Sequence, residues 1–217
     1  VNVGKPSVTY KETVSIKATE ETKYLKQINN KNQFGYVVIT VEPNPQNGIK
    51  FISKIDNKKL PQTYINAIKN SIIENRDSGP FAGFKIEDVL ITLEDSQYIE
   101  GESTEIAYSI AAVQAFTKAF NKALPVLLEP IMKLEIISPE QYIGDIISDI
   151  NRRRGSVVAM GEQGSLKKIE CEVPLSEMFG YATEIRSITQ GRASYSMEFL
   201  KYEKAPEQIM KKIVEIF

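Results

Sequence analysis

The feature that most constrains the fold is a run of six segments, in residues 131–202, that alternate between strand and helix periodicity. Apolar residues at every second position indicate strands, and apolar residues three or four positions apart indicate helices. The predicted strands cover 131–137, 156–162, 166–174 and 193–202, and the predicted helices cover 139–153 and 175–189. The order β-α-β-β-α-β within about 75 residues predicts a ferredoxin-like sandwich, in which two helices pack on one face of an antiparallel sheet.

The residues before this run predict a separate domain that also mixes strands and helices. Alternating β-branched residues indicate a strand at 34–42, with 21–33 as its hairpin partner and polar tip. A further strand is expected at 85–95. Helical spacing follows Pro61, a residue suited to a first helical position, and predicts a helix of about 14 residues within 60–75.

A second helix is expected at 104–123, with Ser103 as its N-cap and one apolar stripe toward the core. The stripe consists of Ile106, Ile110, Val113 and Phe120. The prolines at 125 and 130 then mark a change of domain near Glu129. The sequence therefore predicts an α+β protein with a first domain in 1–128 and a second in 129–205. The last helix, 206–217, is too short to be stable alone and is expected to dock on a neighbouring domain.

The composition excludes several kinds of chemistry. Histidine is absent, so a Ser/His or Cys/His catalytic pair is impossible and the commonest metal ligand is missing. The single cysteine, Cys171, cannot form an internal disulfide and is expected to be a small buried residue of a strand. The acidic stretch 94–105 lacks the spacing of a calcium loop, and we expect no metal site. No phosphate loop of the G-x-x-x-x-G-K-[ST] type occurs, so we expect no nucleotide hydrolysis by this chain.

The net charge of −1 conceals an uneven distribution. Residues 1–69 carry eleven lysines and five acidic residues, a balance of +6, and residues 70–128 carry four basic and nine acidic residues, a balance of −5. A basic face can attract a polyanion even when the whole chain is neutral. Oppositely charged faces that only aid solubility explain the pattern equally well. The sequence has neither a signal peptide nor an apolar run of about 20 residues, so we expect a cytoplasmic protein without membrane contact.

Three consecutive arginines, Arg152, Arg153 and Arg154, end a predicted helix immediately before Gly155. Arginines at this position favour the negative end of the helix dipole, and Gly155 can provide a left-handed cap. Guanidinium groups also bind phosphates in bidentate fashion. We expect mixed use, with at least one arginine held structurally and at least one on RNA.

Two long stretches resemble the fifth domain of bacterial elongation factor G, and a third resembles the start of the fourth domain of that family. The first two read LLEPIMKLEIISPEQYIGDIISDINRRRG and VPLSEMFGYATEIRSITQGRASYSMEF, and the third reads VGKPSVTYKETV. The resemblance implies a fold like domain 2 of ribosomal protein S5 for the first domain, and it implies that the C-terminal helix packs back on that domain. It also implies that a GTP-binding domain, with GTP and Mg²⁺, would precede Val1. We therefore expect the chain to be a fragment, with no cofactor of its own.

The resemblance also implies contact residues on ribosomal RNA. In the family, the loop between the last helix and strand of the fifth domain contacts the sarcin-ricin loop of the large subunit, which assigns contact roles to Ser187, Gln190 and Arg192. Polar side chains on a glycine-containing turn suit a folded RNA loop. An ordinary solvated turn is the alternative interpretation.

The fourth domain of the family reaches the decoding site of the small subunit with two tip loops, and this chain departs from the family pattern in both. The first loop reads NNKNQFG and keeps Lys31 and Gln33, whereas Asn32 is one of the asparagines that replace glycines. Asparagine tolerates left-handed backbone angles, so the loop is expected to keep its shape. The second loop has Tyr98, Ile99 and Glu100, with Ile99 where the family has histidine. Its acidic residues are expected to repel phosphates.

Three functions remain open from the sequence. The first is a ribosome-contacting part of an elongation factor G-like GTPase that promotes movement of transfer RNA and messenger RNA. The second is a paralogue specialised for ribosome recycling with recycling factor, which the loss of the tip-loop histidine favours. The third is a free-standing RNA-binding or small-molecule-sensing module. In each case we expect the chain to be monomeric.

Overall fold

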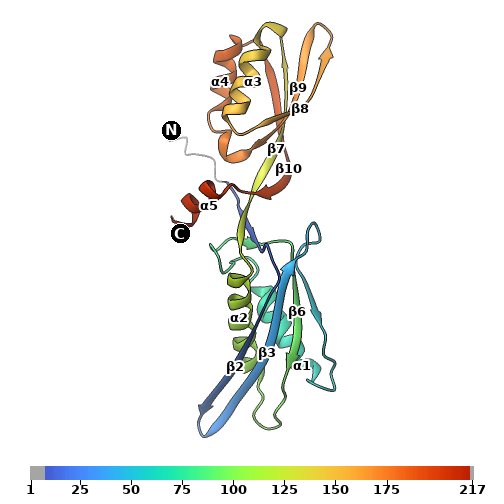
Figure 1. The fold of residues 1–217 in the computed structure, drawn as a ribbon, viewed down its shortest axis with the longest axis vertical. Coiled ribbons are helices and arrows are strands. Elements are labelled where there is room, and N and C mark those ends of the chain that lie inside the picture. Colours follow the sequence, from blue (N-terminus) through green and yellow to red (C-terminus); the bar gives the residue numbers. More distant parts are fainter. Residues whose placement is uncertain (1–7, 216–217) are drawn as a thin grey trace. The chain divides into compact units, whose positions relative to one another are not determined.

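The structure is a computed structural model that describes residues 8–215. The chain divides into two compact units, each with strands and helices, so the fold class is α+β as predicted. The first unit consists of residues 11–127 with the segment that begins at Ala205, and the second unit consists of residues 128–204 with the segment that ends at Tyr10. Figure 1 shows the elements of each unit.

The first unit has a four-stranded mixed sheet in the order β2-β3-β6-β4. β4 runs parallel to β6, and the other neighbours are antiparallel. The strands are β2 (Ala18–Ile28), β3 (Lys31–Pro43), β4 (Lys50–Ser53) and β6 (Val89–Ser96), and the helices are α1 (Gln62–Glu74) and α2 (Glu105–Lys122). Two short strands, β1 (Lys11–Thr13) and β5 (Lys85–Ile86), pair in parallel. The predicted hairpin, strands and helices of this part are confirmed.

The buried face of α2 differs from the predicted one. Small residues spaced three or four apart face the core, together with larger aromatic residues. The buried residues are Ala107, Tyr108, Ala111, Ala112, Ala115, Phe116, Ala119 and Phe120. The predicted stripe is therefore wrong except at Phe120, and Ile106 is 70% exposed. The reason is that alanine side chains allow the helix backbone to lie closer to the sheet than isoleucine would.

The second unit has the predicted β-α-β-β-α-β order, and its sheet is antiparallel in the order β10-β7-β9-β8. The strands are β7 (Val126–Ser138), β8 (Ser156–Gln163), β9 (Leu166–Pro174) and β10 (Ser194–Lys204), and the helices are α3 (Ile143–Arg152) and α4 (Tyr181–Thr189). A 3-10 turn precedes each helix, at Glu140–Tyr142 and at Leu175–Glu177. Both helices lie on one side of the sheet, so this unit is the predicted ferredoxin-like sandwich.

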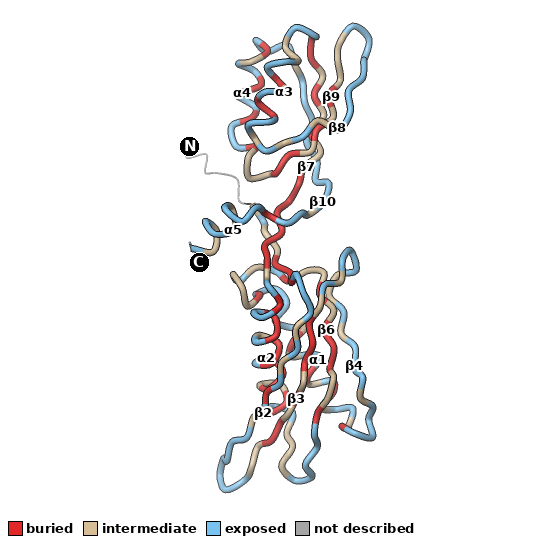
Figure 2. Tube along the Cα trace, in the orientation of Figure 1, coloured by how far each residue is buried: buried red, intermediate tan, exposed pale blue. Residues whose placement is uncertain are grey.

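The core of the second unit lies between this sheet and its helices. Leu134, Ile169 and Cys171 from the sheet pack with Ile146 and Ile150 from α3. Figure 2 colours each residue by burial, and it shows buried residues in β7 and β9 and mostly exposed residues along β10. Burial raises the pKa of the Cys171 thiol to about 11, so the side chain behaves as a small buried apolar group, as predicted.

The predicted C-terminal helix is present as α5 (Glu207–Val214), and its last two predicted residues, 216 and 217, lie outside the described part. The segment groups with the first unit, where the Ala205 N–H donates to the Leu127 carbonyl over 2.9 Å. Ile209 and Ile213 are half-buried, and no described residue of α5 is fully buried. Among residues 8–215, no helix combines the length and the apolar character needed to span a bilayer.

Candidate nucleic-acid interface

The first candidate surface is the end of the β2–β3 hairpin. Ile28 pairs with Lys31, so the turn consists only of Asn29 and Asn30, with φ angles of 52° and 60°. Two successive left-handed residues make the turn that matches the twist of a hairpin, and asparagine is one of the few residues that adopt it readily. The tolerance expected of these asparagines is confirmed. The observed loop is shorter than the predicted one, because Lys31 and the next two residues belong to β3.

The second candidate surface is the loop between β6 and α2. The Ile99 carbonyl accepts hydrogen bonds from the Glu102 and Ser103 N–H groups, and the Ile99 N–H donates to Ser103 Oγ over 2.9 Å. Gly101 adopts a left-handed φ of 81° within this turn. Ser103 therefore organises the loop, and Thr104 is the N-cap of α2, with its hydroxyl accepting from the Ala107 N–H. The expectation that Ser103 caps this helix is wrong.

Hydrogen bonds join these two surfaces into one tip. The Phe34 N–H donates to the Glu102 carbonyl over 2.8 Å, and the Thr104 N–H donates to the Phe34 carbonyl over 3.3 Å. The Asn32 side-chain amide donates to Glu102 Oε1 over 2.8 Å. Gly35 permits this approach, because a Cβ at this position would lie 2.5 Å from the backbone of Ala107. No local pattern indicated this link, since Asn32 and Glu102 are 70 residues apart.

Aromatic side chains pack against the second loop on its core side. The buried Tyr108 hydroxyl donates to the Gln97 carbonyl over 2.5 Å and lies 2.8 Å from Ser103 Oγ. The Tyr64 ring centroid lies 5.0 Å from that of Tyr108 and 5.8 Å from that of Tyr98. Burial raises the pKa of Tyr108, which keeps its hydroxyl protonated as a donor. The exposed Tyr98, Ile99 and Glu100 are thus presented on a fixed support.

The two surfaces of the tip carry opposite charges. Lys23, Lys26 and Lys31 are exposed on the hairpin, whereas the second loop carries Glu100 and Glu102. Two further acidic residues near this loop, Glu94 and Asp95, form ion pairs with Lys54 and Lys59. The hydrogen bond from Lys59 lowers the pKa of Asp95. Two lysines from a part of the chain about 40 residues away therefore offset part of the acidic charge that the sequence predicted to repel phosphates.

Arg153 is held inside the second unit. Its guanidinium donates to Asp149 Oδ2 over 3.0 Å and to the Glu177 carbonyl over 2.7 Å. It also lies over the Tyr181 ring, 5.1 Å from the centroid. Only 13% of the side chain is exposed. Arg153 therefore fills the structural role expected of at least one arginine.

Arg154 joins the helix end to the sheet. Its guanidinium lies 3.1 Å from Glu129 and 3.0 Å from Glu177. Arg154 itself adopts the left-handed conformation, with φ at 57°, so the left-handed cap predicted for Gly155 is wrong. Position 155 requires glycine because of close packing and not because of its backbone angles. A Cβ on Gly155 would lie 2.4 Å from a methyl group of Val173.

Arg152 is the exposed member of the three, with 68% of its side chain accessible. It forms ion pairs with Asp149 and, over 3.4 Å, with Glu184 on α4. The hydrogen bond to Asp149 is the main cause that raises the pKa of Arg152. Most of this guanidinium is free to meet a phosphate.

The third candidate surface is the turn after α4. Ser187, Gln190 and Arg192 are all exposed at this end of the sandwich, so the structure brings the three predicted residues together. Gln190 and Gly191 have φ angles of 53° and 76°, and the Gly191 N–H donates to the Arg186 carbonyl over 2.9 Å. This bond closes the end of the helix and fixes the turn. The left-handed conformation of Gln190 was not predicted from the sequence.

Comparisons with known proteins cover both units. The family model described as "Elongation factor G, domain IV" matches residues 6–124, and the one described as "Elongation factor G C-terminus" matches residues 126–213. The structure is also similar to the crystal structure of ttk003000868 from Thermus thermophilus, with a TM-score of 0.86 and 34% sequence identity. The similarity covers 98% of this chain and 32% of that chain. The present chain thus spans about a third of the length of that protein.

Proposed function

The chain belongs to the elongation factor G family, of which it contains domains IV and V, and we propose that it contacts the ribosome through RNA-binding surfaces on both domains. The observation that carries this proposal is the double match, which accounts for nearly the whole chain. The exposed and internally fixed turns of the two units support it, because a surface that is rigid before binding loses less conformational entropy on binding.

For domain IV we propose that the joined tip enters the decoding site of the small subunit. Lys31 and Gln33 at the hairpin end would contact RNA, together with Asn32 beside them. Tyr98 and Ile99 would meet RNA bases or sugars, because both side chains are exposed on a fixed loop. The bonds between hairpin and loop support a tip that acts as one body beside transfer RNA and messenger RNA.

For domain V we propose that the turn after α4 contacts the sarcin-ricin loop of the large subunit. Ser187, Gln190 and Arg192 would supply hydrogen bonds to phosphates and 2′-hydroxyls. Arg152 would add a phosphate contact, since its guanidinium is the most exposed of the three arginines. Arg153 and Arg154 are held by internal contacts, so we propose that they support RNA binding by keeping this part of domain V in place.

The proposed role is binding, without a catalytic residue. The two matched domains are not the GTP-binding domain of the family, and the sequence has no phosphate loop. GTP and Mg²⁺ belong, by family resemblance, to a nucleotide-binding domain, and we propose that domains IV and V need neither for RNA contact. The setting would be the cytoplasm.

Chemical footprinting on ribosomes tests this proposal. The chain is incubated with 70S ribosomes, and the protection of ribosomal RNA is mapped at the decoding site and at the sarcin-ricin loop. We expect protection at both places, lost at the decoding site when Lys23, Lys26 and Lys31 are replaced together by alanine. Protection of neither place would refute the proposal, and equal binding to unrelated RNA would favour a free-standing RNA-binding module.

A second candidate function, ribosome recycling together with recycling factor, is favoured by the second tip loop. This loop presents an aliphatic Ile99, which is 38% exposed, beside Glu100 and Glu102, and residues 97–105 contain no basic residue. Such a loop is poorly suited to hydrogen bonds with RNA phosphates.

A chimera separates the two candidates. Domains IV and V of an elongation factor G are replaced by this chain, and single-round translocation and subunit dissociation with recycling factor are both measured. Efficient translocation would eliminate the recycling specialisation. Dissociation without translocation would eliminate the translocation role.

A further inference from the structure

Three bulky apolar residues lie on the outer side of α2. Ile106 is 70% exposed, Val113 is 36% exposed, and Ile110 between them is partly exposed. Their spacing of four and three residues places them in one line along the helix. The same helix buries alanines against the sheet. β-branched residues lower helix propensity, so their exposed position brings this chain no benefit in folding.

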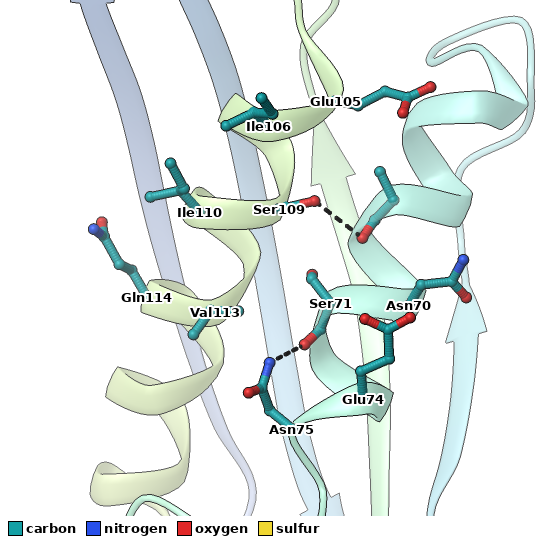
Figure 3. Close-up of a pocket in the computed structure, with 11 residues that line it drawn as sticks. Asn70, Ser71, Glu74, Asn75, Glu105, Ile106, Ser109, Ile110, Val113 and Gln114 are labelled. Atoms are coloured by element: carbon teal, nitrogen blue, oxygen red, sulfur yellow. Dashed lines mark hydrogen bonds between the residues drawn. The ribbon is translucent and has the colours of Figure 1, made fainter.

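These residues border a groove of about 670 Å³ between α1 and α2. Ala67 and Ser71 line it from α1, and Figure 3 shows Ser109 directed from α2 toward α1. The Ser109 hydroxyl donates to the Ala67 carbonyl in a long hydrogen bond of 3.5 Å between the two helices. The groove is thus formed by two helices that pack on the same sheet, and it exists before any partner arrives.

The charged residues of the groove are all acidic. Glu105 lies at one end and Glu74 toward the other in Figure 3, and the eleven residues that line the groove include neither lysine nor arginine. Neither glutamate forms an ion pair within residues 8–215. Asn70, Asn75 and Gln114 complete the rim with uncharged polar groups.

We propose that this groove of domain IV binds an amphipathic helix of another protein, with apolar side chains toward Ile106, Ile110 and Val113 and with lysines or arginines toward Glu74 and Glu105. A helix in a groove buries residues spaced three and four apart, the same spacing as the exposed line on α2. The charges favour a basic partner. The groove begins at Glu105, directly after the second tip loop, and continues between α1 and α2 toward Glu74. Its proposed ligand, a basic helix, differs from the RNA proposed for the tip.

Two other occupants fit the observations less well. RNA would bring phosphates against Glu74 and Glu105, and the groove offers no basic side chain to compensate. A second copy that used the same face would place these glutamates against one another across a symmetric interface. Like charges across an interface oppose association.

Peptide binding tests the proposal. The probe is a fluorescent synthetic peptide of about 18 residues, or five helical turns, with leucines at helical spacing and lysines on both sides of the leucine stripe. Its partner probe has glutamates in place of the lysines. Anisotropy is measured with the whole 217-residue chain. We expect the lysine peptide to bind at least about tenfold more tightly than the glutamate peptide, a difference of about 1.4 kcal/mol.

Two variants connect this binding to the groove. Ile106→Lys is expected to abolish binding of the lysine peptide, and the paired change Glu74→Lys with Glu105→Lys is expected to reverse the preference between the peptides. Ile16→Lys, which changes an exposed isoleucine outside the groove, is the matched control and leaves binding intact. Circular dichroism checks that each variant is folded, because the changed side chains are exposed.

Three results would overturn the proposal. The first is no binding of either peptide, and the second is binding that Ile106→Lys leaves unchanged. The third is self-association of the chain, measured by light scattering, that Ile106→Lys abolishes. This last result would assign the groove to a second copy.

Discussion

At the scale of single residues, the neighbours of a side chain determine its use more than its type does. The three adjacent arginines show this, because their side chains are 68%, 13% and 30% exposed. Helical spacing turns Arg153 toward Asp149 and the 177–179 segment, while Arg154 turns toward Glu129. Only Arg152 is left mainly to the solvent.

Replacement of Arg153 by alanine should destabilise domain V. The change leaves the buried Asp149 with fewer partners and removes the donors to two backbone carbonyls, and we expect a loss of about 2–4 kcal/mol in the free energy of unfolding. Arg152→Ala removes the mainly exposed partner of Asp149 and no bond to a backbone carbonyl, so it is the comparison variant and should lower the urea midpoint much less. Urea titration followed by circular dichroism measures both. Equal midpoints for the two variants would contradict the structural role of Arg153.

Glu129 should make stability depend on pH. Burial is the main cause that raises the pKa of this carboxyl above its ordinary 4.5, and the nearby Arg154 opposes the shift only in part. Because the folded-state pKa is the higher one, the contribution to stability is fully present below pH 4.5 and is lost as the pH rises through the folded-state value. The stability of the wild type minus that of Glu129→Gln should therefore be larger at pH 4 than at pH 7. Urea titrations at the two pH values measure it, and a difference that grows with pH would show that the pKa is lowered instead.

Residue type indicated some of these roles from the sequence and missed others. Cys171 was predicted to be buried because a lone cysteine in an alternating strand has few other uses. The helix cap at Thr104 and the left-handed Arg154 were not predicted, because Ser103 and Gly155 next to them satisfy the same local preferences. Contacts with distant parts of the chain decide between such neighbours.

At the scale of elements, the tip of domain IV depends on close contact between segments that are far apart in the sequence. β3 and the start of α2 approach so closely that only glycine fits at position 35. The hydrogen bonds from Phe34 and Asn32 to Glu102 then join hairpin and loop. Asn32, which departs from the family pattern in the first tip loop, is thus the partner of Glu102 in the second.

Gly35→Ala should strongly destabilise domain IV. The added Cβ would lie 2.5–2.6 Å from backbone atoms of Ala107 and Tyr108, which cannot move away without distorting the helix. We expect a loss of at least about 2 kcal/mol. Gly144→Ala is the control, since nothing lies within 4 Å of its added Cβ, and it should stabilise α3 by about 0.5–1 kcal/mol. Thermal unfolding of both variants measures this, and an unchanged midpoint for Gly35→Ala would contradict the close approach.

The pair of Asn32 and Glu102 should be energetically coupled. A double-mutant cycle with Asn32→Ala and Glu102→Ala should give a coupling of about 1 kcal/mol, the usual contribution of a partly exposed hydrogen bond. Hydrogen exchange at the Phe34 amide should become faster in both single variants, because their changes loosen the contact between hairpin and loop. Additive effects with unchanged exchange would mean that the two surfaces of the tip are independent.

Element order was predictable where periodicity is strong, and the packing face was not. The six elements of domain V have clear alternation or helical spacing, and their order is confirmed. In α2, spacing alone selected the large apolar residues, whereas the structure buries alanines and leaves Ile106 outside. Whether a small or a large residue suits a helix face depends on the distance to the sheet, which the sequence does not contain.

At the scale of the whole molecule, the chain consists of two compact units that each present exposed, internally fixed turns. The family assignment explains why both units occur in one chain, and neither unit offers a histidine for acid and base chemistry. The sequence could indicate the ribosome as partner only through the stretches that resemble the family. Which basic residues are engaged in ion pairs, and which remain exposed, is decided by the fold and could not be predicted from the sequence.

The most direct test of the central claim is the affinity of this chain for 70S ribosomes at several salt concentrations. The account predicts binding that weakens steeply with salt, and a slope that Arg152→Ala reduces by about one. Arg76→Ala, which removes an exposed arginine of domain IV outside the tip, is the matched control and should leave affinity and slope unchanged. If the chain fails to bind ribosomes at low salt, the claim that its two units contact ribosomal RNA is contradicted.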